Sequence, residues 1–107
     1  MPVSDPNSVD LVTRDPRSGE VALIMVEDRP WDGSEARMAE VQAKANAYLA
    51  FALDGQLPRA FPEARGQPLR VQLDCVTEPD PATAEFLAAL GAAVEGEGVR
   101  FVVNVLD

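Results

Sequence analysis

The sequence of 107 residues contains no histidine and only one cysteine, Cys75. Without histidine, the chain lacks the commonest general base of enzymes and the commonest metal ligand of proteins. A single cysteine cannot form a disulfide within the chain, which favours a reducing compartment. No apolar run approaches the roughly 18 residues of a membrane helix, and no basic start followed by an apolar run indicates a signal peptide. We therefore expect a cytoplasmic protein that is not an enzyme and that holds no metal and no cofactor.

Positive charge is also scarce, because 18 Asp and Glu residues stand against 9 Lys and Arg residues, for a net charge of −9. Phosphate-rich surfaces repel such a chain, so we expect it to bind neither nucleic acid nor a membrane surface. A basic protein partner, a cationic ligand or simple solubility all fit the acidic composition. Apolar residues make up 47% and charged residues 25% of the chain, which is ordinary for one globular domain and does not indicate disorder.

The chain is organised around residues 21–55, where an apolar strand leads into a charged turn and then into the longest helix. The run VALIMV at 21–26 predicts a strand that is buried on both faces. Two residues compete for the N-cap of the helix: Asp32, within a capping box, and Ser34. The helix then continues without Gly or Pro to Leu53. Its apolar stripe follows three- and four-residue spacings and comprises Met38, Val41, Ala45, Tyr48, Leu49 and Ala52.

The length of this helix exceeds that of the strand it must cover. A helix of roughly 20 residues is about 30 Å long, whereas a strand of six residues covers about 20 Å. The helix therefore overhangs the predicted sheet, and Phe51 and Leu53 near its end need further cover. The segment from Leu57 to Phe61 could supply that cover, and so could a second copy of the chain.

The remaining sequence predicts three more strands and a second helix. The strands fall at residues 9–14, 69–76 and 99–106, and the helix starts at Pro81 after the N-cap Asp80 and ends at 96–98. Residues 1–8 form a flexible tail, and residues 55–68, with three prolines, form a connection without an element. The order ββαβαβ predicts a single α/β (α+β) domain over residues 9–107. We expect a two-layer sandwich in which two helices cover one face of a four-stranded mixed sheet.

The opposite face of this sheet is left uncovered in the predicted arrangement. Strand alternation places polar side chains on it, namely Arg14, Arg70, Gln72, Asp74, Arg100 and Asn104. A half-polar face of this kind fits a solvated surface, and it fits a wet protein–protein interface equally well. Cys75 alternates onto the inward face of the strand at 69–76, where it is expected to be a small core residue.

The turn between the strand and the long helix holds the best candidate binding site. It lies beyond the carboxyl end of an inner strand and before a helix N-terminus, where open α/β sheets bind ligands. The candidate binding residues are Glu27, Asp28, Arg29, Trp31, Asp32 and Tyr48. An aromatic face beside three carboxylates could hold a cation or a basic side chain. In the structural alternative, Asp32 caps the helix, Arg29 pairs with Asp28 or Glu27, and Trp31 covers the helix end. The carboxylates lack EF-hand spacing, so we expect no metal there.

Two strings of the sequence, MVEDRPWDGS at 25–34 and NAYLAFALDGQL at 46–57, carry a resemblance. In them the chain resembles an uncharacterised bacterial family of small proteins of about a hundred residues. The resemblance implies one small α/β domain and transfers no activity. Our first hypothesis is a non-enzymatic protein-interaction module that forms a homodimer. The alternatives are an acidic partner of a basic protein, of the immunity or inhibitor type, and a small-molecule binder at the Trp31 turn.

Overall fold

The computed structural model describes residues 11–106, so the predicted tail at 1–8 lies outside the described residues. The strands are β1 (Leu11–Arg14), β2 (Val21–Glu27), β3 (Leu69–Cys75) and β4 (Arg100–Val105). The helices are α1 (Glu35–Leu53), α2 (Gln56–Ala60) and α3 (Pro81–Gly96), with a short 3-10 turn η1 (Pro62–Ala64). The strands form one four-stranded sheet in the order β1-β2-β3-β4. β1 runs antiparallel to β2, while β2, β3 and β4 are parallel, so the sheet is mixed as predicted.

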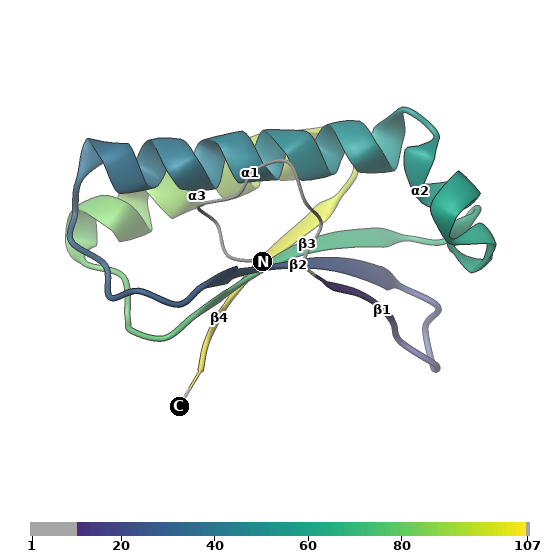
Figure 1. Ribbon diagram of the computed structural model, residues 1–107, viewed down its shortest axis with the longest axis horizontal. Coiled ribbons are helices and arrows are strands. Elements are labelled where there is room, and N and C mark those ends of the chain that lie inside the picture. Colours follow the sequence, from purple (N-terminus) through teal and green to yellow (C-terminus); the bar gives the residue numbers. More distant parts are fainter. Residues whose placement is uncertain (1–10, 107) are drawn as a thin grey trace.

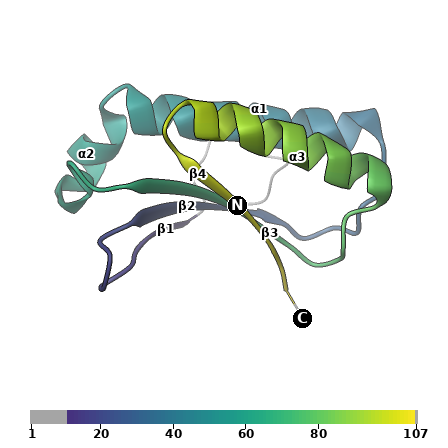
Figure 2. The ribbon, with the colours of Figure 1, turned by 180° about the vertical axis from the view of Figure 1, so that it is seen from behind.

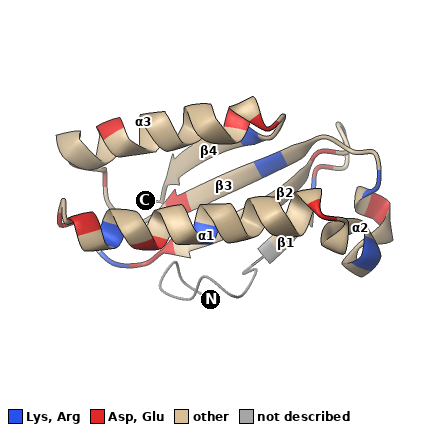
Figure 3. Ribbon diagram, turned by 90° about the horizontal axis from the view of Figure 1, so that it is seen from above, with Lys and Arg blue, Asp and Glu red and all other residues tan. Residues whose placement is uncertain are grey.

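The long helices α1 and α3 lie side by side above the sheet (Figures 1 and 3). The predicted order ββαβαβ is wrong in one respect, because α2 and η1 stand between α1 and β3 where we expected no element. Pro58 and Pro62 fall in the first turns of these two short segments, where a missing backbone N–H costs nothing. Gly55, at φ +93°, makes the left-handed bend from α1 into α2.

The segment after α1 supplies the cover that the overhanging helix needs. Leu57 of α2 is 1% exposed and belongs to the core, and Phe51 packs against that core. Leu53, in contrast, is 52% exposed. α2 therefore protects one side of the α1 terminus and leaves the other in solvent (Figure 1).

The core lies between the helices and the inner strands β2 and β3. Residues 21–25 are all buried, which confirms the strand predicted to be covered on both faces. In β3 the residues Val71, Leu73 and Cys75 are fully buried, whereas Gln72 and Asp74 alternate with them and are partly exposed. The period-two pattern of the sequence thus gives the inward face of β3 correctly, including the buried position of Cys75.

Arg14 does not lie on the open face of the sheet, which corrects our prediction. The antiparallel register pairs Arg14 with Val21, a core residue, and directly opposed residues share one face of a sheet. Arg14 instead lines a small hollow with Phe61 and Ala64 on the helix side. The register is set by the turn, in which the Asp15 N–H donates to the Glu20 carbonyl. Strand alternation alone does not reveal it.

The two long helices begin at capping side chains. The Ser34 hydroxyl accepts a hydrogen bond from the Arg37 N–H at 3.1 Å, so Ser34 and not Asp32 is the N-cap of α1. Asp80 caps α3 as predicted, because its carboxylate accepts from the Thr83 N–H at 3.2 Å. The predicted apolar stripe of α1 is largely buried, and Lys44, which was not part of the prediction, is fully buried as well.

Candidate functional site

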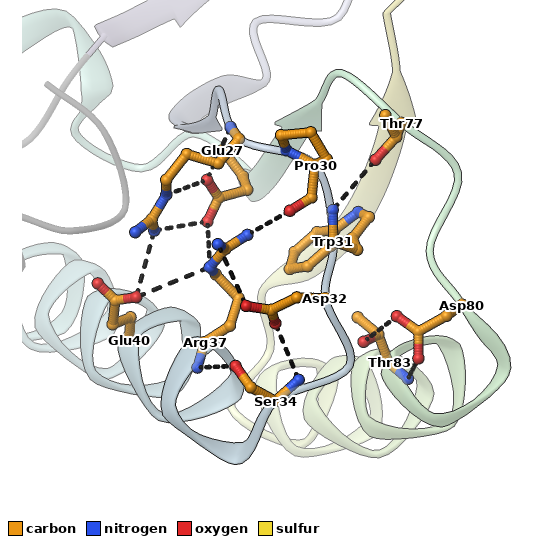
Figure 4. A network of polar contacts seen from close by, with 11 residues as sticks. Glu27, Pro30, Trp31, Asp32, Ser34, Arg37, Glu40, Thr77, Asp80 and Thr83 are labelled. Atoms are coloured by element: carbon orange, nitrogen blue, oxygen red, sulfur yellow. Dashed lines mark hydrogen bonds and ion pairs between the residues drawn. The ribbon is translucent and has the colours of Figure 1, made fainter.

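The buried carboxylate of Glu27 is the centre of the turn between β2 and α1. Glu27 is the last residue of β2, points to the helix side like Met25, and is 0% exposed. Its two oxygens accept hydrogen bonds from Arg29 Nε at 2.8 Å and Arg29 Nη2 at 2.9 Å, and the Arg29 N–H donates at 3.0 Å (Figure 4). The bidentate pair with Glu27 raises the pKa of Arg29 above its ordinary value. The sequence left open whether Arg29 pairs with Asp28 or Glu27, and the structure shows Glu27.

Two residues of the first turns of α1 complete this network. Arg37 Nε lies 3.7 Å from Glu27, and Arg37 Nη1 donates to the Pro30 carbonyl at 2.8 Å. Glu40 lies 3.2 Å from Arg29 and 3.8 Å from Arg37 (Figure 4). The two arginines and two glutamates balance in charge, and together they tie the turn to the start of α1. We call Glu27, Arg29, Arg37 and Glu40 the turn network.

Asp32 supports the helix start without capping it. Its carboxylate accepts from the Ser34 N–H at 2.9 Å and lies 3.6 Å from Arg37 Nη2. The hydrogen bond from Ser34 lowers the pKa of Asp32 below its ordinary value. Gly33 has φ +72°, a left-handed conformation that turns the chain into α1. A Cβ there would lie 3.2 Å from the Asp80 carboxylate, so the starts of α1 and α3 are packed closely.

Trp31 faces inward, which differs from the exposed aromatic face that we expected. The backbone N–H of Trp31 donates to the Thr77 hydroxyl at 3.3 Å, and the ring is partly buried against the core. Among the described residues, the buried indole Nε1 has no regular hydrogen-bond partner. Burial raises the pKa of the Cys75 thiol above its ordinary value, and the nearby Trp31 side chain offsets this rise only in part. Trp31 thus packs against the core beside Thr77, whereas the structural alternative placed it over the helix end.

The other predicted members of this site are not brought together with it. Tyr48 is 0% exposed, and its hydroxyl donates to the Ile24 carbonyl at 3.0 Å, so it is a core residue and not an accessible binding group. Asp28 is exposed to solvent. The Lys44 ammonium, which sequence reasoning passed over, lies 5.5 Å from the centre of the Tyr48 ring. Sequence reasoning also missed Arg37 and Glu40, although their i, i+3 spacing next to a predicted helix start was a signal.

The polar residues of the open face pair with one another in two clusters. Glu20, which we did not predict, lies 2.6 Å from Arg70 Nη1 and 2.8 Å from Arg100 Nη2. The hydrogen bond from Arg100 lowers the pKa of Glu20 below its ordinary value. Asp74 accepts from the side-chain amides of Gln72 at 2.7 Å and Asn104 at 3.2 Å. The charged groups of these clusters pair within the chain, as on a solvated sheet face, although the buried Arg70 Nε has no hydrogen-bond partner among the described residues.

An apolar groove of about 420 Å³ runs between α3 and the outermost strand β4. Figure 2 views the molecule from this side, with α3 above β4. Glu95 is the one charged residue of the groove lining. Val103 of β4 is 37% exposed, and Leu106, just beyond the strand, is 43% exposed. We define the β4–α3 face by the residues Ala84, Ala88, Gly91, Ala92, Phe101 and Val103.

Within residues 11–106, no group of three or more His, Cys, Asp or Glu side chains could hold a metal ion. No helix in this range has the length and apolar character needed to cross a membrane. A family model described as "Family of unknown function (DUF6572)" matches residues 1–107. No curated protein and no solved structure matches the chain.

Proposed function

The chain belongs to the DUF6572 family of unknown function, and we propose that it is a non-enzymatic protein-interaction module that associates with itself through the β4–α3 face. The observation that carries the proposal is an edge strand with exposed apolar side chains beside an apolar groove. Edge strands present a row of backbone hydrogen-bonding groups that can pair with another chain. A second apolar surface next to that row favours a protein partner over solvent.

The turn network is a poor alternative binding site, because its charged groups already satisfy one another. Glu27 is fully buried and is held by Arg29 in a bidentate pair. A ligand that took Arg29 would remove the bidentate partner of the buried Glu27 charge and leave only Arg37, 3.7 Å away, and breaking a buried ion pair costs up to about 3–5 kcal/mol. The network therefore supports a structural role, in which it fixes the start of α1.

The open face is also less suited to association than the β4–α3 face. Arg70 and Arg100 are paired with Glu20, so a partner would have to compete with these ion pairs. Two copies of a chain with net charge −9 repel each other. Repulsion is smallest where the surface carries little charge, and Glu95 is the single charged residue in the groove lining. Charge therefore favours the β4–α3 face for contact between copies.

The sequence of β4 is consistent with an interface and not with a protected edge. Its residues RFVVNV contain one charge and no proline. Natural edge strands that avoid pairing use lysine, proline or bulges. Leu106, just beyond the strand, is 43% exposed, and its N–H donates to the Cys75 carbonyl at 2.7 Å.

The mass of the protein in solution tests this proposal. Light scattering after size-exclusion chromatography at micromolar concentration should give a dimer for the natural chain and a monomer for Val103→Lys. Leu53→Lys is the matched control, because Leu53, which is 52% exposed against 37% for Val103, is also exposed apolar surface but lies at the end of α1. It should remain a dimer. A natural chain that is monomeric throughout would overturn the proposal.

Added salt separates self-association from capture by a basic protein. Two acidic copies repel each other, so salt should strengthen the dimer through screening. A complex between this acidic chain and a basic protein should instead weaken as salt rises. Dimerisation that weakens steadily with salt would contradict the apolar contact proposed here.

A further inference from the structure

We draw no further inference here: the strongest candidate, the apolar groove between α3 and the edge strand β4, carries nothing beyond the proposed self-association, because nothing in the part of the chain that the structure describes shows what covers it.

Discussion

Replacing Glu27 by glutamine should destabilise the domain by about 2 kcal/mol, although the two side chains have nearly the same shape. The carboxylate is 0% exposed and accepts from two nitrogens of Arg29 at 2.8 and 2.9 Å. Glutamine has one acceptor oxygen, and its amide N–H₂ would face a guanidinium donor. One of the two charge-assisted bonds is therefore lost, and the other becomes weaker.

The magnitude follows from the exposure of the partners. Removing one partner of a fully buried ion pair costs about 3–5 kcal/mol, and a hydrogen bond to a charged group contributes about 1.5–3 kcal/mol. The lower range applies because the Arg29 side chain is 37% exposed, so water can solvate it, and Glu40 remains 3.2 Å away. For a domain of about 100 residues, a loss of 2 kcal/mol lowers the melting temperature by roughly 8 °C.

Urea unfolding followed by the fluorescence of Trp31 measures the loss. All variants are compared at one protein concentration, because self-association shifts apparent stability. The control is Glu40→Gln, whose side chain contacts the same arginines but is 34% exposed. It should cost less than about 1 kcal/mol. If Glu27→Gln were no more destabilising than Glu40→Gln, Glu27 would not be the buried centre of the turn network.

Two further substitutions test other parts of the fold. Tyr48→Phe keeps the buried ring but removes the hydroxyl that donates to the Ile24 carbonyl at 3.0 Å, so the free energy of unfolding should fall by about 1–2 kcal/mol; an unchanged urea midpoint would contradict that hydrogen bond. Arg100 and Arg70 lower the pKa of Glu20 in the folded protein. The ion pairs of the Glu20 carboxylate therefore stabilise the fold above the unfolded pKa, and this stabilisation is lost as pH falls through the folded pKa. Glu20→Gln should therefore be less stable than the natural chain at neutral pH, with the difference shrinking below pH 4.5, the ordinary pKa of the carboxyl; a difference that is constant with pH would show that Glu20 is not held by these arginines.

The main elements could be predicted from the sequence because they depend on local patterns. The alternation in residues 69–76 gives the inward face of β3, and the run at 21–26 gives the central strand β2. Asp80 before Pro81 marks the start of α3. In each case a periodic pattern or a cap forms within a few residues and does not depend on distant contacts.

Other features depend on contacts between distant segments and could not be predicted in this way. Arg14 was assigned to the wrong face because the hairpin register, and not strand alternation alone, fixes its direction. α2 was missed because its proline was taken as a breaker, although buried Leu57 holds the short helix in place. Arg37 and Glu40 join the turn network only because the start of α1 returns to the end of β2.

The contact at β4 is tested most directly by sedimentation velocity over a dilution series of the natural chain and of Val103→Lys. The natural chain should sediment as a dimer at high concentration and as a monomer on dilution, while Val103→Lys stays monomeric and folded at every concentration. A natural chain that never exceeds the monomer mass, or a Val103→Lys variant that dimerises equally well, would contradict the account.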